Sequence, residues 1–199
     1  MPRVGGLRVG VAHHLGWAVA VTAADDHSVV DRRRIELIEP GVPNAPIHHH
    51  GGTHAMHAQS PPLDDDALAA LVESVRTSAV RTTAHALDEL TGALPAAVES
   101  LSLRAWPADF PDDIARLRLV PYESRADSVM YRQVLAELAS ARGWMVHLFD
   151  DKRVERDAAS LLGERADAVL HGPRATLGPP WSKDHRMALA ATITCAADR

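Results

Sequence analysis

The sequence predicts an α/β domain built on a mixed five-stranded sheet that is flanked by helices. Three strand-like runs open the chain, and two more alternate with segments of helical apolar spacing. Short links join the first three runs, which favours an antiparallel meander, whereas strands separated by helices pair in parallel. A chain of 199 residues usually forms one domain, so we expect one over residues 1–199.

The meander is predicted over residues 7–12, 17–23 and 29–38. The stretch GVAHHLGWAVA at residues 10–20 places a turn at His13 to Gly16 between two apolar runs. The segment 39–65 then has no apolar period and carries five prolines, three glycines and five histidines. Loops of this length are usually functional or disordered, and we expect this one to be mobile because it has little to bury.

The rest of the chain predicts alternating helices and strands. Asp64 to Asp66 begin a helix that Gly92 ends, since acidic residues favour a helix N-terminus and glycine favours its end. The further elements are a strand at 98–103, a helix at about 127–142, a buried strand at 144–149, a short helix at about 153–162, a Gly/Pro loop around 172–180 and a helix from about 183.

Composition excludes several classes of protein. The net charge of −5 gives no global attraction to nucleic acid, so a basic surface would have to be local. The single cysteine, Cys195, allows no internal disulfide and indicates a reducing compartment. The chain shows no signal-peptide layout and no run of 18 apolar residues. We therefore expect a cytoplasmic protein without a membrane partner.

Three stretches, in this order, resemble the ribonuclease H-like superfamily and specifically its RuvC/YqgF-type, Holliday-junction resolvase-like members. They are the strand–turn–strand at 9–19 with its Gly16-Trp17 dipeptide, the stretch from Phe149 to Leu162, and DHRMALA at 184–190. The resemblance spans most of the chain outside the histidine-rich segment. It implies a ribonuclease H-like sheet and divalent metal ions held by clustered carboxylates, which activate water and stabilise the leaving oxygen of a phosphodiester.

The residues that correspond to those carboxylates depart from the family. Ala12 stands where the first strand should end in Asp, Arg104 where the fourth strand should end in an acidic residue, and Met187 where the last helix should carry Asp. Asp184 keeps an acidic identity. Magnesium requires oxygen ligands, which alanine and methionine lack, and arginine would repel the ion. We therefore expect no magnesium- or manganese-dependent nuclease activity.

The same end of the resembled fold offers a different set of candidate ligands. His13, His14, Asp184 and His185 would suit zinc or another divalent transition metal, or acid–base chemistry near neutral pH, with Asp184 and His185 as catalytic residues. The alternative is that both turn histidines face water and that Asp184 only favours the first turn of its helix. Apart from such a metal, no cofactor is expected.

Two further groups carry alternative interpretations. Arg104, Asp151 and Arg153 could bind a phosphate or carboxylate ligand, or could form ordinary ion pairs at a strand end. His48, His49, His50, His54 and His57 could handle nickel, copper or zinc, or belong to a flexible polar loop.

These observations favour a RuvC/YqgF-like domain that has lost metal-dependent nuclease activity and acts in binding. Its partner would be a structured nucleic acid or a protein, and the resemblance implies a homodimer. One alternative is a hydrolase or nuclease with a rebuilt His/Asp metal site, that is, a metal-dependent phosphodiester hydrolase. A second alternative is a metal-handling protein that acts through its histidine-rich segment. Fold alone does not choose among them, because function depends on the site.

Overall fold

A mixed five-stranded sheet forms the centre of the computed structural model, which describes residues 6–52 and 61–197. Its strands are β1 (Leu7–His13), β2 (Trp17–Ala23), β3 (Val29–Glu36), β4 (Val98–Arg104) and β5 (Met145–Phe149). The strand order β3-β2-β1-β4-β5 places β1 in the middle. The pairs β1–β2 and β2–β3 are antiparallel, and β1–β4 and β4–β5 are parallel. The predicted sheet is confirmed.

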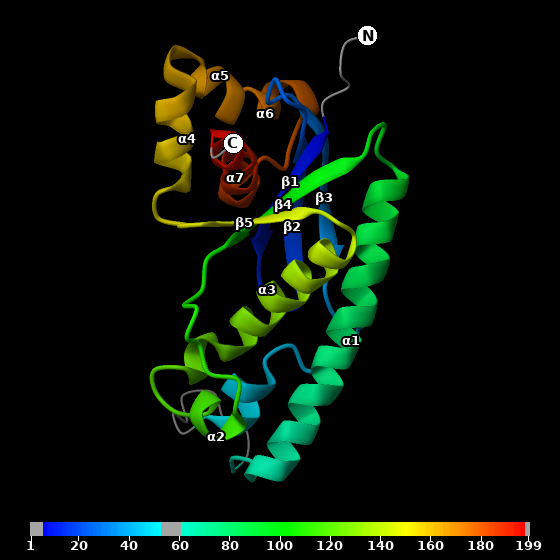
Figure 1. Cartoon of the computed structure of the whole chain (residues 1–199), viewed down its shortest axis with the longest axis vertical. Helices are drawn as coiled ribbons and strands as arrows, with labels where there is room; N and C mark the ends of the chain where they lie inside the picture. The colour runs from blue at the N-terminus through cyan, green and yellow to red at the C-terminus, as the bar shows by residue number, and fades with distance from the viewer. Residues whose placement is uncertain (1–5, 53–60, 198–199) are drawn as a thin grey trace.

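Two groups of helices cover the two faces of the sheet (Figure 1). The long helices α1 (Asp65–Gly92) and α3 (Glu123–Ala141) pack on one face, and the final helix α7 (Lys183–Ala197) crosses the other. The shorter elements are α2 (Ile114–Leu117), α4 (Val154–Leu162), the 3₁₀ turn η2 (Gly163–Arg165), α5 (Ala166–Leu170) and α6 (Pro173–Leu177). Sequence reasoning did not predict α2, η2, α5 or α6, because single turns lack enough residues to show a period.

Side-chain alternation along β1 divides the core into two layers. Val9 and Val11 face α1 and α3, where Val134 and Leu135 of α3 are also fully buried. Gly10 and Ala12, which alternate with these two valines, face α7. Each fully buried Val or Leu contributes about 1.5–3 kcal/mol, so the α1/α3 layer, with its large aliphatic residues, supplies much of the stability.

The α7 layer is built from small residues and allows backbone to approach backbone. A Cβ atom at Gly10 would lie 1.8 Å from the carbonyl oxygen of Ala188 in α7. Ala12 of β1 and Ser100 and Ser102 of β4 continue this surface of small side chains, all buried. Consequently α7 lies directly on β1 and on its two neighbours, β2 and β4.

Two predicted boundaries need correction. β3 ends at Glu36 rather than at residue 38, although the chain remains buried at Leu37 and Ile38. α3 begins at Glu123, four residues before the predicted start, and this added turn carries the buried Glu123 and Ala126. Polar residues such as Glu123 hide the apolar period there, so the sequence pattern begins late.

The prediction that 144–149 forms a buried strand is wrong for most of its length. β5 lies at the edge of the sheet, and Met145 and Leu148 are about half exposed, at 47% and 50%. Only the flanking Trp144 and the last residue, Phe149, are buried. An apolar run of six residues predicts a strand but does not reveal whether a neighbour covers it.

The expectation that segment 39–65 has little to bury is also wrong for its first half. Ala45 and Ile47 are buried, and residues Ile47–Gly51 form a π-helical turn, η1. The backbone N–H groups of Ile47 and His48 donate to the two carboxylate oxygens of Asp127 in α3, at 3.1 and 2.9 Å. This contact could not be foreseen because its acceptor lies 80 residues away. His54 and His57 lie outside the described residues.

Across residues 6–52 and 61–197, none of the helices combines the length and apolar character needed to cross a bilayer.

The contact between Gly10 and Ala188 yields a stability prediction. Gly10→Ala should lower the free energy of unfolding by about 1–3 kcal/mol or more, because the added methyl group meets backbone that cannot rotate away. Chemical denaturation monitored by circular dichroism measures this change. Gly92→Ala is the matched control: its Cβ meets nothing within 4 Å, so it should be neutral or stabilising by up to about 1 kcal/mol. Equal stability of Gly10→Ala and the parent chain would contradict the close approach.

Candidate functional site

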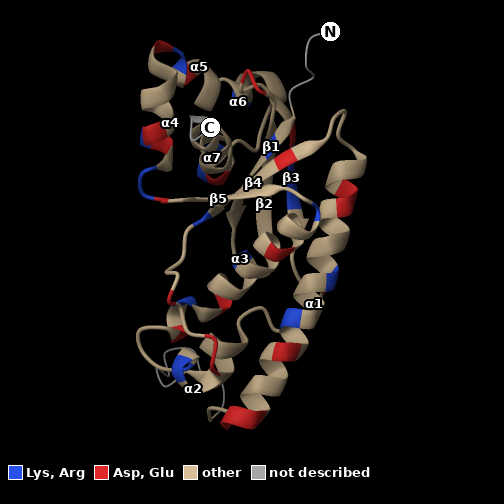
Figure 2. Ribbon diagram, in the orientation of Figure 1, with Lys and Arg blue, Asp and Glu red and all other residues tan. Residues whose placement is uncertain are grey.

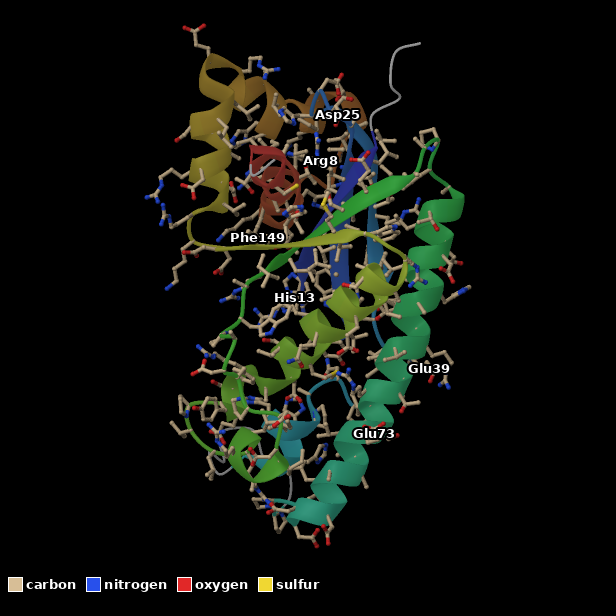
Figure 3. The ribbon with its side chains drawn as sticks, in the orientation of Figure 1. Arg8, His13, Asp25, Glu39, Glu73 and Phe149 are labelled. Carbon is tan, nitrogen blue, oxygen red and sulfur yellow. The ribbon has the colours of Figure 1, made fainter. Side chains whose placement is uncertain are left out.

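The carboxyl ends of three parallel strands and the start of α7 meet at one edge of the sheet. β1 ends at His13, β4 at Arg104 and β5 at Phe149. Figure 3 places His13 and Phe149 at this edge and Arg8 at the opposite end of β1. Parallel strands present their carboxyl ends together, and this is where α/β sheets commonly bind ligands.

The central contact of this edge joins the β1–β2 turn to α7. The Nε2 atom of His14 lies 3.1 Å from Oδ2 of Asp184, and the two side chains are 41% and 28% exposed. The imidazole also stacks on Trp17, with ring centroids 4.1 Å apart and planes 10° apart. The guanidinium of Arg34 in β3 lies 4.0 Å from the centre of the same indole ring. His14 is therefore held by a carboxylate at one atom and by an aromatic face.

A cavity of about 440 Å³ opens beside this contact, between β2, β3 and the N-terminus of α7. Trp17, Arg32, Arg34, Asp184 and His185 are among its lining residues. The Arg32 guanidinium donates to the carbonyl oxygens of Leu177, Gly178 and Pro180, so it ties the chain entering α7 to the edge strand. The cavity thus combines cationic, aromatic and carboxylate groups.

His13 points to the opposite face of the sheet from Asp184, because neighbouring strand residues alternate. His13 is partly buried. Burial, followed by the charges of Arg132 and Arg104 and the ring of His14, lowers its pKa to about 3. His13 is therefore neutral near pH 7. It sits among arginines and has the wrong orientation to join His14 and Asp184 around one ion.

His185 serves the local structure of the α7 N-terminus. Its Nδ1 atom accepts a hydrogen bond from the backbone N–H of Ser182 at 3.2 Å and lies 2.8 Å from the Ser182 hydroxyl oxygen. This is the arrangement of a capping box, in which the third helical residue accepts from the N-cap. Burial, followed by the charge of Arg32, lowers the pKa of His185. Because Nδ1 of His185 accepts a hydrogen bond, the neutral imidazole carries its proton on Nε2.

The predicted ligand-binding group is brought together only in part. Arg104 forms an ion pair with Asp151 at 3.2 Å, whereas Arg153 pairs with Asp157 on its own helix at 3.6 Å. Sequence reasoning missed Arg132, which is 4% exposed and donates to the carbonyl oxygens of Arg104 and Ala105. No sequence signal marks Arg132, because its role depends on where β4 ends against α3.

The hard-metal site that the resemblance implies does not fit the residues present. Ala12 is 1% exposed and packs, together with Met187 of α7, in the apolar layer between α7 and the sheet. Arg104 carries a positive charge and pairs with Asp151. Within the part of the chain that the structure describes, no three His, Cys, Asp or Glu side chains converge on a shared metal position. The predicted set of His13, His14, Asp184 and His185 is represented by one contact, between His14 and Asp184.

Comparison with known proteins identifies the fold. No family model matches the sequence, and no curated protein sequence matches it significantly. Among solved structures, T. thermophilus RuvC in complex with Holliday junction substrate matches with a TM-score of 0.52 at 12% identity, covering 96% of this chain and 93% of that one. A second Thermus thermophilus RuvC structure has a TM-score of 0.49 at 11% identity, with the same coverage of both chains. The chain therefore has a RuvC-type, ribonuclease H-like fold, as its sequence predicted.

The environment of His13 yields a pH prediction. The unfolded chain binds this proton near pH 6.5 and the folded chain only near pH 3, so the contribution of His13 to stability falls as the pH drops below 6.5. Between pH 7 and pH 5 the parent chain should lose about 2 kcal/mol more than His13→Gln. Urea unfolding of both proteins at each pH tests this, and the paired comparison cancels other groups. An NMR titration of His13 with a midpoint near 6.5 would contradict it.

Proposed function

We propose that this protein is a RuvC-fold binding domain that recognises structured nucleic acid and has lost metal-dependent phosphodiester cleavage. The observation that carries the proposal is that Ala12, Arg104 and Met187 lie where the resemblance implies metal-binding carboxylates, two of them in apolar surroundings. Hard cations require several oxygen ligands, and Asp184 is the one acidic residue retained at the corresponding positions. Two-metal hydrolysis needs several such ligands, and no group of three or more converges among the described residues.

The case for nucleic acid rests on the cations of the same edge. Basic segments lie where β4 ends and where the chain enters α4 (Figure 2). Arg104 and Arg153 are 48% and 60% exposed, and Lys152 and Lys183 extend the set. The RuvC of similar fold is in complex with Holliday junction substrate. Because this chain is acidic overall, binding depends on these local contacts and therefore weakens steeply with salt.

One observation favours a second candidate, an enzyme with a rebuilt site. His14 and Asp184 meet at 3.1 Å beside the lined cavity, and a carboxylate that orients an imidazole is a common arrangement in acid–base catalysis. In that case hydrolysis would depend on His14 and Asp184, which would serve as ligands of a transition metal such as zinc. Metal handling through the histidine-rich segment stays a further alternative.

Binding and cleavage of a labelled four-way DNA junction test the proposal together. We expect binding by fluorescence anisotropy at low salt, falling by about tenfold or more between 50 and 200 mM salt, and no cleavage with Mg²⁺ or Mn²⁺. The double variant Arg104→Ala/Arg153→Ala should bind about 5–10-fold more weakly, because two phosphate contacts are removed.

The matched control is Arg81→Ala, an exposed arginine of α1 that pairs with Glu39 away from this edge and should leave binding unchanged. Junction cleavage that disappears in Asp184→Ala would overturn the loss of activity. Cleavage with Zn²⁺ that disappears in His14→Ala would favour the rebuilt enzyme instead. Absence of junction binding at low salt would leave a protein partner, including a second copy, as the preferred ligand.

A further inference from the structure

A second cavity lies far from the sheet edge, in the lobe formed by the N-terminal halves of α1 and α3. α1 is 28 residues long, about 42 Å, and extends well beyond the sheet (Figure 1). There it packs against α3, α2 and η1 rather than against strands. A cavity of about 550 Å³ opens among these elements, within the size range of small-molecule sites. Figure 3 labels Glu73, which borders it from α1.

The walls of this α1–α3 cavity are largely apolar. Val72 of α1, Val129 and Met130 of α3, Ile47 of η1, and Phe110 and Ile114 from the segment around α2 are among the residues that line it. Such walls favour a ligand with an apolar body, because each Å² of apolar surface removed from water contributes about 25 cal/mol.

The charged groups of the cavity are mainly acidic. Its lining includes four carboxylates, from Glu73, Asp112, Asp127 and Glu137, and one guanidinium, from Arg76. That guanidinium is already engaged: Nη2 of Arg76 donates to both oxygens of Glu137, at 2.7 and 2.6 Å, and so links α1 to α3. The cavity therefore presents net negative charge to an incoming molecule.

Asp127 is the strongest reason to expect a cationic ligand in this cavity. It is 3% exposed, and its two carboxylate oxygens each accept one backbone N–H, from Ile47 and His48. Among the described side chains no Lys, Arg or His forms an ion pair with it. An ionised carboxylate offers about four acceptor positions, so each oxygen keeps capacity for another donor. A buried charge without a counter-ion is costly, and a cation would offset that cost.

We propose that the α1–α3 cavity binds a small organic cation with an apolar body, of the primary-amine class. The ammonium group donates hydrogen bonds to Asp127, and the apolar body packs between Val72 and Met130. The exposed carboxylates of Glu73 and Asp112 attract the cation to the opening. The site is independent of the sheet edge, so its ligand and any nucleic acid bind without sharing residues.

Isothermal titration with three molecules of one shape tests the proposal. The probes are 4-phenylbutylamine, 4-phenylbutanol and 4-phenylbutanoate, which differ mainly in charge. We expect the amine to bind at least tenfold more tightly than the alcohol and the carboxylate not to bind. Equal binding of amine and alcohol, or no binding of the amine, overturns the proposal.

Variants locate the site. Asp127→Asn should weaken amine binding at least tenfold, and Glu73→Gln, on an exposed surface, about two- to threefold with a smaller salt dependence. Ala69→Trp fills the cavity from α1 and should abolish binding, whereas Ala70→Trp changes the neighbouring exposed position outside it. This pair remains informative if Asp127→Asn fails to fold. Amine binding retained in Ala69→Trp would overturn the assignment, and junction binding should be unchanged in both.

Discussion

The approach of α7 to the centre of the sheet is the constraint on which the rest of the structure depends. It is possible because Gly10 has no side chain and the Ala188 carbonyl occupies the space where one would lie. This crossing sets the height of the α7 N-terminus above β1, and so brings Asp184 to the turn that carries His14. The same crossing buries Ala12 and encloses Met187 in apolar surroundings. One small residue thus links the core to the geometry of the edge.

That edge has the electrostatic character of an anion-binding surface. Where the family resemblance implies carboxylates around cations, this chain has Arg104 and the buried Arg132, and both cations lower the pKa of the nearby His13. Burial, followed by the charges of Arg104 and Arg125, lowers the pKa of Arg132 to about 10, so it remains charged at neutral pH. Phosphate groups would be attracted here and metal ions repelled. Under the proposed function, this edge would accept a phosphate group in place of a metal ion.

The opposite end of the molecule depends on a buried negative charge. Burial raises the pKa of Asp127 to about 6, although the hydrogen bonds from His48 and Ile47 act in the other direction. Near pH 7 the carboxylate is mostly ionised and holds η1 against α3. Its proximity also contributes, after burial, to the raised pKa of Tyr131. Burying an ionised carboxylate is energetically costly, and the proposed cationic ligand would offset that cost.

The sequence by itself determined the strands, the long helices, their order and the mixed pairing, because apolar period and link length are local properties. The resemblance also predicts that Ala12, Arg104 and Met187 stand where the family has carboxylates, and this correspondence stays a prediction. Only the tertiary structure decided that β5 is an exposed edge, that His13 and His14 face opposite sides, and that His185 caps a helix. The partners of Arg132 and Asp127 likewise come from distant segments. Such contacts depend on how elements pack in three dimensions, and no spacing along one chain records them.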